Sequence, residues 1–392
     1  MFPKKLIEKI ELRKQNNALR KLDVDTKCLV DFSSNDYIGF SKSKAIYNNT
    51  IQYLKTHHIT ANGATGSRLL SGNHGLYAVV EQQLSAFYKI PSALVFNSGY
   101  NANVGFFSSI PQRGDVILYD AFIHASIRDG MLMSNAKAYK FEHNNLSSLT
   151  SLLERFKNQC HAIYVVTESV FSMDGDTPDL ISLTQLCKKH DAFLVVDEAH
   201  AVGVFGENGA GLVQSLNLQR DVFARIVTFG KALGCHGAAI LGSELLKQYL
   251  VNFSRSFIYT TALSPHSLAA IHVAYNAIAV LPASKKIDQN IIFFKAKVKA
   301  LGLESIFITS QSAIHCCVIA GNVRVKNIAQ KIRDAGFNVK AILSPTVPKN
   351  KERLRFCLHS YNTHQEISDV LELLQSILTE NCSALFNDEV ES

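Results

Sequence analysis

Between about residues 50 and 280, the chain carries short and nearly continuous apolar runs that are separated by helix-length stretches. Such runs are typical of strands buried on both faces of a largely parallel sheet. The longer stretches between them have the mixed polarity of covering helices. The pattern therefore predicts an α/β domain, with strands that include residues 93–96, 115–119, 162–166, 193–196, 225–228 and 238–241.

The pattern changes toward both ends of the chain. Apolar residues recur at mostly helical spacing in residues 4–22, which predicts an amphipathic helix, and residues 32–37 are expected to form a short strand that turns into a polar loop. After a helical stretch at residues 268–278, the remainder is typical of a smaller α+β domain with strands at 313–319 and 353–357. The predicted divisions are an N-terminal helix and arm (1–41), a large domain (42–280) and a small C-terminal domain (281–392).

The composition is that of an ordinary globular protein, because 47% of the 392 residues are apolar and 19% are charged. The formal charge of +7 is consistent with a slightly basic surface, and it also favours a polyanionic substrate such as coenzyme A. Basic runs with interleaved aromatic residues are missing, so we expect no nucleic-acid partner.

The eight cysteines are scattered without the spacing of a zinc site or a disulfide framework, which favours reduced thiols and predicts no metal site. No apolar run reaches membrane-spanning length, and the N-terminus has no signal-peptide core. These features predict a cytoplasmic protein without a membrane partner.

Polar residues follow the ends of the predicted strands. In an open α/β sheet, ligands bind beyond the carboxyl ends of the strands. The sequence therefore predicts one binding edge, formed by residues 97–100, 120–124, 167–168, 197–200 and 228–231.

Three residues at this edge suit the chemistry of pyridoxal phosphate. The cofactor needs an amine that attacks its aldehyde, a carboxylate that keeps its ring nitrogen protonated, and a donor near its phenolic oxygen. Lys231, Asp197 and His200 have these groups. A lysine that follows a strand is most often a surface residue, and an aspartate there is often a helix cap. The combination of all three predicts the cofactor.

The phosphate group of such a cofactor needs N–H donors at a helix start and hydroxyl groups. Ser98, Gly99 and Tyr100 form a small-residue turn into a helix, and Thr228 offers a side-chain hydroxyl. A Ser-Gly turn is a weak signal by itself.

Taken as a set, the motifs resemble those of the α-oxoamine synthases, which are fold-type I pyridoxal phosphate enzymes. The resemblance runs almost end to end and implies a mostly parallel seven-stranded sheet with a smaller C-terminal domain. The motifs that carry it are residues 33–39 (SSNDYIG), 63–74 (GATGSRLLSGNH), 167–176 (TESVFSMDGD) and 257–261 (FIYTT).

The resemblance implies further cofactor contacts. His124 matches the histidine that stacks on the cofactor ring and touches the substrate, Ser172 matches a serine near the phenolic oxygen, and Glu168 lies in the same motif. Thr261 resembles a residue that reaches the phosphate from the partner subunit, which implies a homodimer with shared active sites. Ser172 and Thr261 also suit purely structural roles, as a turn residue and a strand cap.

Substrate contacts follow from the same resemblance. Arg355 matches the arginine that binds the amino-acid carboxylate, with help from Asn35 and His124, and a guanidinium can bind two carboxylate oxygens at once. Arg20 resembles an arginine that contacts the acyl substrate, and Thr346 a threonine that contacts the substrate. A solvated helix face and a turn are the structural alternatives for these two residues.

Family members condense an amino acid with an acyl-CoA and release carbon dioxide. The motifs resemble most the biotin-pathway member, which uses L-alanine and pimeloyl-CoA or a pimeloyl carrier thioester. Glycine C-acetyltransferases, serine palmitoyltransferases, an aminotransferase and a cofactor-free regulatory subunit are the alternatives. Departures from the family pattern are Ala262, Glu198 and Tyr77, and none of them removes a group that the chemistry requires.

Overall fold

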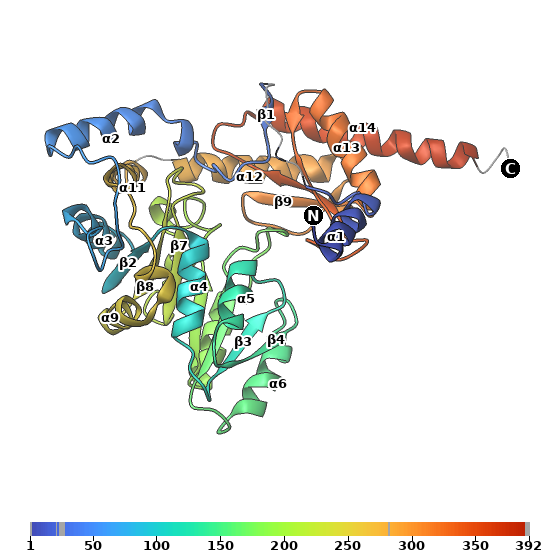
Figure 1. Ribbon diagram of the computed structural model, residues 1–392. Helices are drawn as coiled ribbons and strands as arrows, with labels where there is room; N and C mark the ends of the chain where they lie inside the picture. Colours follow the sequence, from blue (N-terminus) through green and yellow to red (C-terminus); the bar gives the residue numbers. More distant parts are fainter. Residues whose placement is uncertain (1, 21, 23–27, 281–282, 389–392) are drawn as a thin grey trace. The chain divides into compact units, whose positions relative to one another are not determined.

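A computed structural model of the chain describes residues 2–20, 22, 28–280 and 283–388 (Figure 1). Its contacts divide the chain into two compact units. The large unit holds residues 36–172 and 177–285, and the small unit holds residues 1–35, 173–176 and 286–392. The N-terminal segment thus belongs to the same compact unit as the C-terminal part of the chain. The division into three domains that the sequence suggested remains a prediction.

The large unit is built on a seven-stranded sheet with the strand order β2-β8-β7-β6-β5-β3-β4. Its strands are β2 (Ser92–Phe96), β3 (Val116–Asp120), β4 (Lys137–Phe141), β5 (Ile163–Glu168), β6 (Phe193–Asp197), β7 (Ala224–Thr228) and β8 (Ala238–Gly242). All neighbouring pairs from β7 to β4 are parallel, and β8 is antiparallel to both β2 and β7. The prediction of a mostly parallel α/β sheet is confirmed.

Helices cover both faces of this sheet, because successive side chains of a strand point to opposite faces. In β6, Val195 joins a core cluster with the helices α4, α5 and α9, whereas Leu194 and Val196 join a second cluster with α6, α7 and α8 (Figure 1). The helices of the large unit are α2 (Lys44–Thr56), α3 (Gly75–Phe87), α4 (Gly99–Ser109), α5 (Ala125–Leu132), α6 (Leu146–Phe156), α7 (Leu180–Lys189), α8 (Leu212–Ser215), α9 (Glu244–Phe253), α10 (Arg255–Ile258) and α11 (Pro265–Ile278), with the 3-10 turns η1 (Phe40–Lys42) and η2 (Glu207–Gly209).

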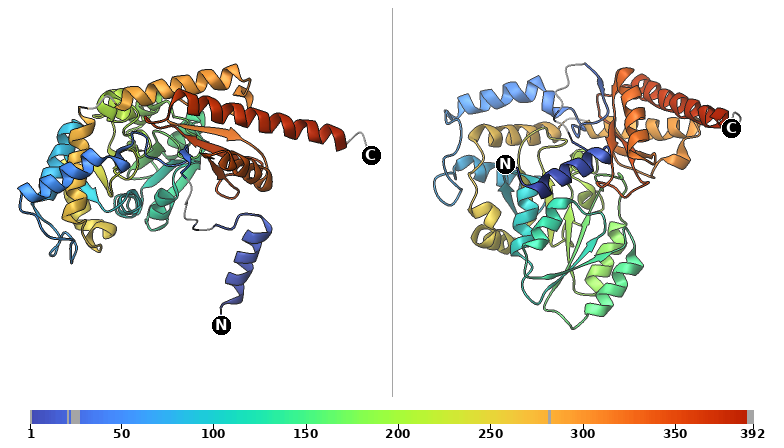
Figure 2. Two further views of the ribbon diagram at one scale, coloured as in Figure 1. Left: turned by 90° about the horizontal axis from the view of Figure 1, so that it is seen from above. Right: turned by 45° about the vertical axis from the view of Figure 1, so that its right-hand side comes forward.

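The small unit combines a three-stranded antiparallel sheet, of order β11-β12-β9, with a parallel pair of β1 and β10. Figure 2 shows its last element, α14, as one long helix. The elements of this unit are α1 (Lys4–Gln15), β1 (Val30–Asp31), η3 (Glu304–Ile306), β9 (Ile314–Val318), α13 (Asn322–Asp334), β10 (Phe337–Asn338), β11 (Lys340–Ile342), β12 (Arg353–Cys357) and α14 (His364–Asp388), together with most of α12 (Ala283–Ala300).

Two predictions near the N-terminus are wrong. The first helix ends at Gln15 instead of residue 22, because Asn17 adopts a left-handed conformation (φ 51°) that ends a helix; residues 21 and 23–27 lie outside the described part. The strand expected at residues 32–37 is limited to Val30–Asp31. The Asp31 carboxylate accepts hydrogen bonds from the backbone N–H groups of Ser33 and Ser34, and this side-chain turn ends the strand.

A fully buried ion pair lies behind the end of β6. The side chains of Glu198 and Arg225 are both 0% exposed, and Arg225 Nε donates to Glu198 Oε2 at 2.7 Å. Arg225 also donates to the carbonyl of Ala210, and its guanidinium stacks over Tyr88. The positive charge of Arg225 and the negative charge of Glu198 therefore neutralise each other inside the core.

Arg225→Ala should destabilise the protein by about 3–5 kcal/mol, because it leaves the Glu198 charge buried without its partner. Urea unfolding followed by circular dichroism measures the effect. The matched control is Lys188→Ala, which breaks an exposed pair with Asp221 and should cost only about 0–1 kcal/mol. Unfolding of both variants at the same urea concentration would contradict this assignment.

Candidate functional site

The predicted polar residues of the large unit gather where its parallel strands end. Glu168, Asp197 and Thr228 are the last residues of β5, β6 and β7, and Glu168 and Asp197 are register partners. The sheet therefore holds these side chains side by side at one edge.

Asp197 is the best-anchored group of this edge. It is 6% exposed, and its Oδ1 accepts a hydrogen bond from the backbone N–H of Ala199 at 2.9 Å. Its Oδ2 accepts from Asn103 Nδ2, also at 2.9 Å. These two donors fix the plane of the carboxylate.

His124 is linked to the same amide group. It precedes α5, and its Nδ1 lies 2.7 Å from Ser126 Oγ and accepts from the Ser126 N–H at 3.2 Å. Asn103 Nδ2 donates to Ser126 Oγ at 3.0 Å. His124 is an exposed residue by its accessible surface, but the partial burial of its side chain lowers the pKa of His124, and the Lys231 charge acts in the same direction against the opposing effect of Asp197.

Glu168 is a buried acid beside Asp197. Burial raises the pKa of Glu168 well above its usual range, and the negative charge of Asp197 adds to the effect. Its Oε1 has no hydrogen-bond partner among the described residues. Burial and the Asp197 charge favour the neutral form of Glu168, against the opposing effects of the Lys231 charge and of the His124 backbone N–H.

His200 lies three residues after Asp197 and is 6% exposed. Its Nδ1 is 2.6 Å from the hydroxyl of Tyr37, which is fully buried. A hydroxyl that donates to Nδ1 leaves the proton of the neutral ring on Nε2. His200 can then act as a donor through Nε2, as the cofactor assignment requires.

Lys231 lies on the loop between β7 and β8. The base of the loop is closed by hydrogen bonds from the Phe229 N–H to Gly237 and from the Cys235 N–H to Phe229. Gly234 adopts φ 61°, and a Cβ there would approach the Ser41 N–H to 2.3 Å. The backbone that carries the lysine is therefore tightly fixed.

A helix start and a hydroxyl lie together at the expected phosphate position. Ser98 caps α4 through a hydrogen bond from the Asn101 N–H, and a Cβ on Gly99 would contact Thr228 at 3.7 Å. Tyr100 is half-exposed and donates to Asp129 at 2.6 Å, which raises the pKa of Tyr100. The N–H groups of α4 and the Thr228 hydroxyl thus form one cradle.

Ser172 and Thr261 are the two other residues predicted to contact the cofactor. Ser172 is partly buried in the turn after β5. Thr261 is exposed on the large unit, and its carbonyl accepts a hydrogen bond from Asn97. Their assigned roles remain predictions.

The residues expected to contact substrate belong to the small unit. Arg355 is 5% exposed, and its guanidinium donates to Asn35 Oδ1 at 3.0 Å and to Cys357 Sγ at 2.8 Å. Arg20 lies 3.4 Å from the hydroxyl of Thr346. The structure thus pairs Arg355 with Asn35 and Arg20 with Thr346.

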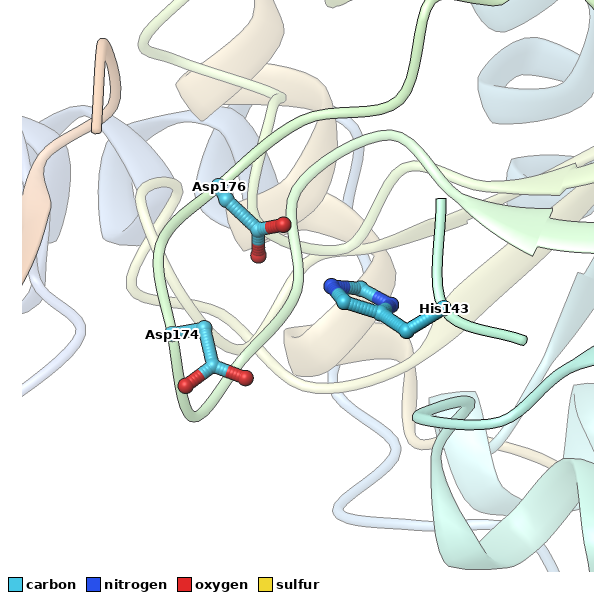
Figure 3. A group of neighbouring side chains, drawn as sticks. All are labelled: His143, Asp174 and Asp176. Carbon is cyan, nitrogen blue, oxygen red and sulfur yellow. The ribbon is translucent and has the colours of Figure 1, made fainter. Parts of the chain in front are cut away.

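Arg353 has a different kind of partner from Arg355. It forms an ion pair with Asp174, which shares a turn with Asp176 (Figure 3). His143, also drawn in Figure 3, belongs to the large unit, where its Nδ1 lies 2.8 Å from Asp120. Because Asp174 occupies Arg353, Arg355 is the better candidate for a substrate carboxylate.

Asn103, Ser126 and Tyr37 were not identified as site residues from the sequence. Asn103 had a usable signal, because it shares the buried face of α4 with Phe106 and Phe107. A polar residue within an apolar helical stripe requires a buried hydrogen-bond partner. Ser126 and Tyr37 had no comparable signal.

Comparisons with known proteins agree with this geometry. A family model described as aminotransferase class I and II matches residues 27–374. An 8-amino-7-oxononanoate synthase of Emericella nidulans is 38% identical to this chain over 95% of each sequence. This chain belongs to the α-oxoamine synthase family.

Solved structures of other α-oxoamine synthases are also similar. A serine palmitoyltransferase of Sphingomonas wittichii has a TM-score of 0.83 at 27% identity, with 95% of each chain covered. An 8-amino-7-oxononanoate synthase of Francisella tularensis has a TM-score of 0.77 at 28% identity, covering 90% of this chain and 98% of the other. The fold-type I assignment is confirmed.

Pyridoxal phosphate is the cofactor of this α-oxoamine synthase, and the residues of the large unit fit it. A carboxylate for the ring nitrogen, a donor histidine, an amine and a helix start are all present. Glu168 Oε1 is buried and has no hydrogen-bond partner within the described part of the chain, so it is a further polar atom that a bound group can satisfy. Among the described residues, no helix has the length and apolar character that a membrane span needs.

Lys231 is expected to be the residue that carries the cofactor. Borohydride treatment of the holoenzyme, followed by peptide mapping, should place the reduced cofactor on the Lys231 peptide. Lys231→Ala should lose the label and the visible absorbance but keep its far-ultraviolet circular dichroism. Lys247→Ala, which removes a lysine bound to Glu81, serves as the control. A label on any other lysine contradicts the assignment.

Proposed function

We propose that this enzyme condenses L-alanine with pimeloyl-CoA, or with a pimeloyl carrier thioester. The products are 8-amino-7-oxononanoate, carbon dioxide and the free thiol, and the reaction belongs to biotin biosynthesis. The observation that carries this proposal is the 38% identity to an 8-amino-7-oxononanoate synthase over 95% of both chains. The large unit supports the proposal because it places a fixed carboxylate, Asp197, and an amine, Lys231, at or just after the ends of neighbouring strands of the sheet.

When bound, pyridoxal phosphate supplies an aldehyde for the amino group of alanine and a ring that stabilises negative charge at its Cα. Asp197, held by Asn103 and Ala199, would pair its negative charge with the ring nitrogen. His200 would donate from Nε2 to the phenolic oxygen, and Ser98, Gly99 and Thr228 would hold the phosphate.

Lys231 Nζ acts as the general base that removes the α-proton of alanine. The alanine Cα then forms a bond to the thioester carbonyl carbon, and the C–S bond breaks to release a thiolate, which takes a proton from solvent. The carboxyl group leaves as carbon dioxide, and Lys231 returns a proton to the same carbon. The fixed loop of Lys231 suits these two proton transfers, because only the side chain needs to move.

Arg355 binds the carboxylate of alanine, assisted by Asn35. A buried guanidinium forms strong paired hydrogen bonds with a carboxylate. His124 offers Nε2–H to the thioester oxygen. Arg20, beside Thr346, attracts the distal carboxylate of the pimeloyl chain.

Incubation of the holoenzyme with amino acid and thioester pairs tests the proposal. Mass spectrometry should detect 8-amino-7-oxononanoate from alanine and pimeloyl-CoA, and Lys231→Ala should give none. Glycine with acetyl-CoA and serine with palmitoyl-CoA are the comparison pairs. The second of these has structural support, because serine palmitoyltransferases have TM-scores up to 0.85 with this chain. Preferential turnover of either comparison pair would overturn the choice of substrate.

We also propose that the enzyme is a cytoplasmic homodimer in which Thr261 serves the partner's phosphate site. The seven cysteines that the structure describes are free thiols, which favours a reducing compartment. Large apolar side chains are exposed in the motifs at residues 63–74 and 257–261: Leu70 is 84% exposed and Tyr259 is 73% exposed. A second copy of the chain is the expected cover for these side chains.

Leu70→Asp should weaken the dimer, because a carboxylate would be buried at the interface. Sedimentation velocity should then show monomers at concentrations where the wild type is dimeric. The matched control is Ile181→Asp, which changes an exposed apolar residue of α7 and should remain dimeric. A monomeric wild type refutes the homodimer.

A further inference from the structure

Asn103 occupies a central position between two functional side chains. It lies on α4 and is 2% exposed, and its two amide hydrogens have different acceptors. One hydrogen bond goes to Asp197 Oδ2 and the other to Ser126 Oγ. The reversed amide would place its oxygen against the Asp197 carboxylate, so electrostatic repulsion fixes the orientation.

The bond to Ser126 determines what that hydroxyl can do. Ser126 is fully buried, and its Oγ accepts from Asn103, so its single hydrogen is directed to the other close neighbour, His124 Nδ1, 2.7 Å away. The Ser126 N–H also donates to Nδ1. With two donors directed at it, Nδ1 is an acceptor, and the neutral ring carries its proton on Nε2.

We infer that Asn103 is a positioning residue that holds His124 in the neutral form with the proton on Nε2, while the same amide orients Asp197. The inference rests on the proposed function, since it gives the thioester oxygen a neutral donor. A charged His124 would place a second positive charge beside Lys231, which must lose its proton to act as a base.

The charged surroundings of His124 are consistent with a neutral ring. The residues that face it are Asp197 at the end of β6, Lys231 after β7, Glu168 at the end of β5 and Asp129 on α5. Burial raises the pKa of Glu168 and so favours its neutral form, and Asp129 already accepts a hydrogen bond from Tyr100. The hydrogen bonds at Nδ1 therefore decide the proton position.

Without Asn103, the Ser126 hydroxyl is free to rotate, so that its oxygen can accept a hydrogen bond from a protonated Nδ1 of His124. In Asn103→Ala, the protonation midpoint of His124 should rise by roughly half to one pH unit, which is the strength of one ordinary hydrogen bond. Ser126→Ala removes the donor itself and should raise the midpoint in the same direction. Because both changes remove one linkage, the double variant should show about the shift of a single variant.

The midpoint of His124 can be measured on the full-length protein with its cofactor. Exchange of the imidazole C2 hydrogen for deuterium is followed at different pH values by mass spectrometry of the His124 peptide. The acidic limb of kcat against pH should move upward in parallel in both variants. A residue that only supports the fold would change stability without moving either midpoint.

Gln112→Ala is the matched control, because Gln112 also donates through its amide to several acceptors, just beyond the other end of α4. In Gln112→Ala, the protonation midpoint of His124 should equal that of the wild type. An unchanged midpoint in either folded site variant, or an equal rise in Gln112→Ala, overturns the inference. Absence of 8-amino-7-oxononanoate from the wild-type reaction instead refutes the proposed function and leaves the exchange result intact.

Discussion

The Asp197 carboxylate, held at the end of a central strand by two N–H donors, organises the rest of the large unit. A negative charge at this edge is needed for the cofactor ring, and water alone would not keep it in one orientation. The backbone of Ala199 and the side chain of Asn103 provide the fixed donors. Burial, and after it the Asp197 charge, raises the pKa of the neighbouring Glu168.

The residue that follows Asp197 shows how the strand end is stabilised. Asp197 points to the binding edge, whereas Glu198 points into the core and meets the guanidinium of Arg225. Two successive carboxylates thus have different surroundings, since Asp197 lies at the proposed cofactor site and Glu198 stabilises the core. Glu198 departs from the family pattern, and this buried ion pair stabilises it at its position. Tyr77 also departs from the pattern, and other contacts stabilise it: its ring lies under the Arg68 guanidinium, and its hydroxyl accepts a hydrogen bond from the Leu263 N–H.

The sequence predicted the central strands correctly because each of them is buried on both faces and reads as a continuous apolar run. It missed β4 because Lys137–Phe141 is an edge strand whose side chains are mostly exposed. It missed β10 and β11 because strands of two or three residues carry too little pattern. The length of α1 was overestimated because helical spacing continues past Asn17, where the backbone turns.

The candidate site divides in a similar way. Lys231, Asp197 and His200 could be proposed from the sequence because the chemistry of one cofactor requires their groups and each of them follows a predicted strand; their roles remain predictions. The link from Asp197 through Asn103 and Ser126 to His124 could not be predicted, because it joins β6, α4 and α5 across the fold. Such contacts depend on helix packing, which local patterns do not record.

The loop of Lys231 has a consequence for how the enzyme cycles. Its two ends are continuous with β7 and β8, and its middle packs so closely against residues 40 and 41 that only a glycine fits at position 234. In the role proposed for Lys231, release of the amine during each turnover would be a rotation about side-chain bonds, without movement of the main chain. Such rotations are fast on the scale of catalysis, so this segment needs no slow opening motion between rounds of chemistry.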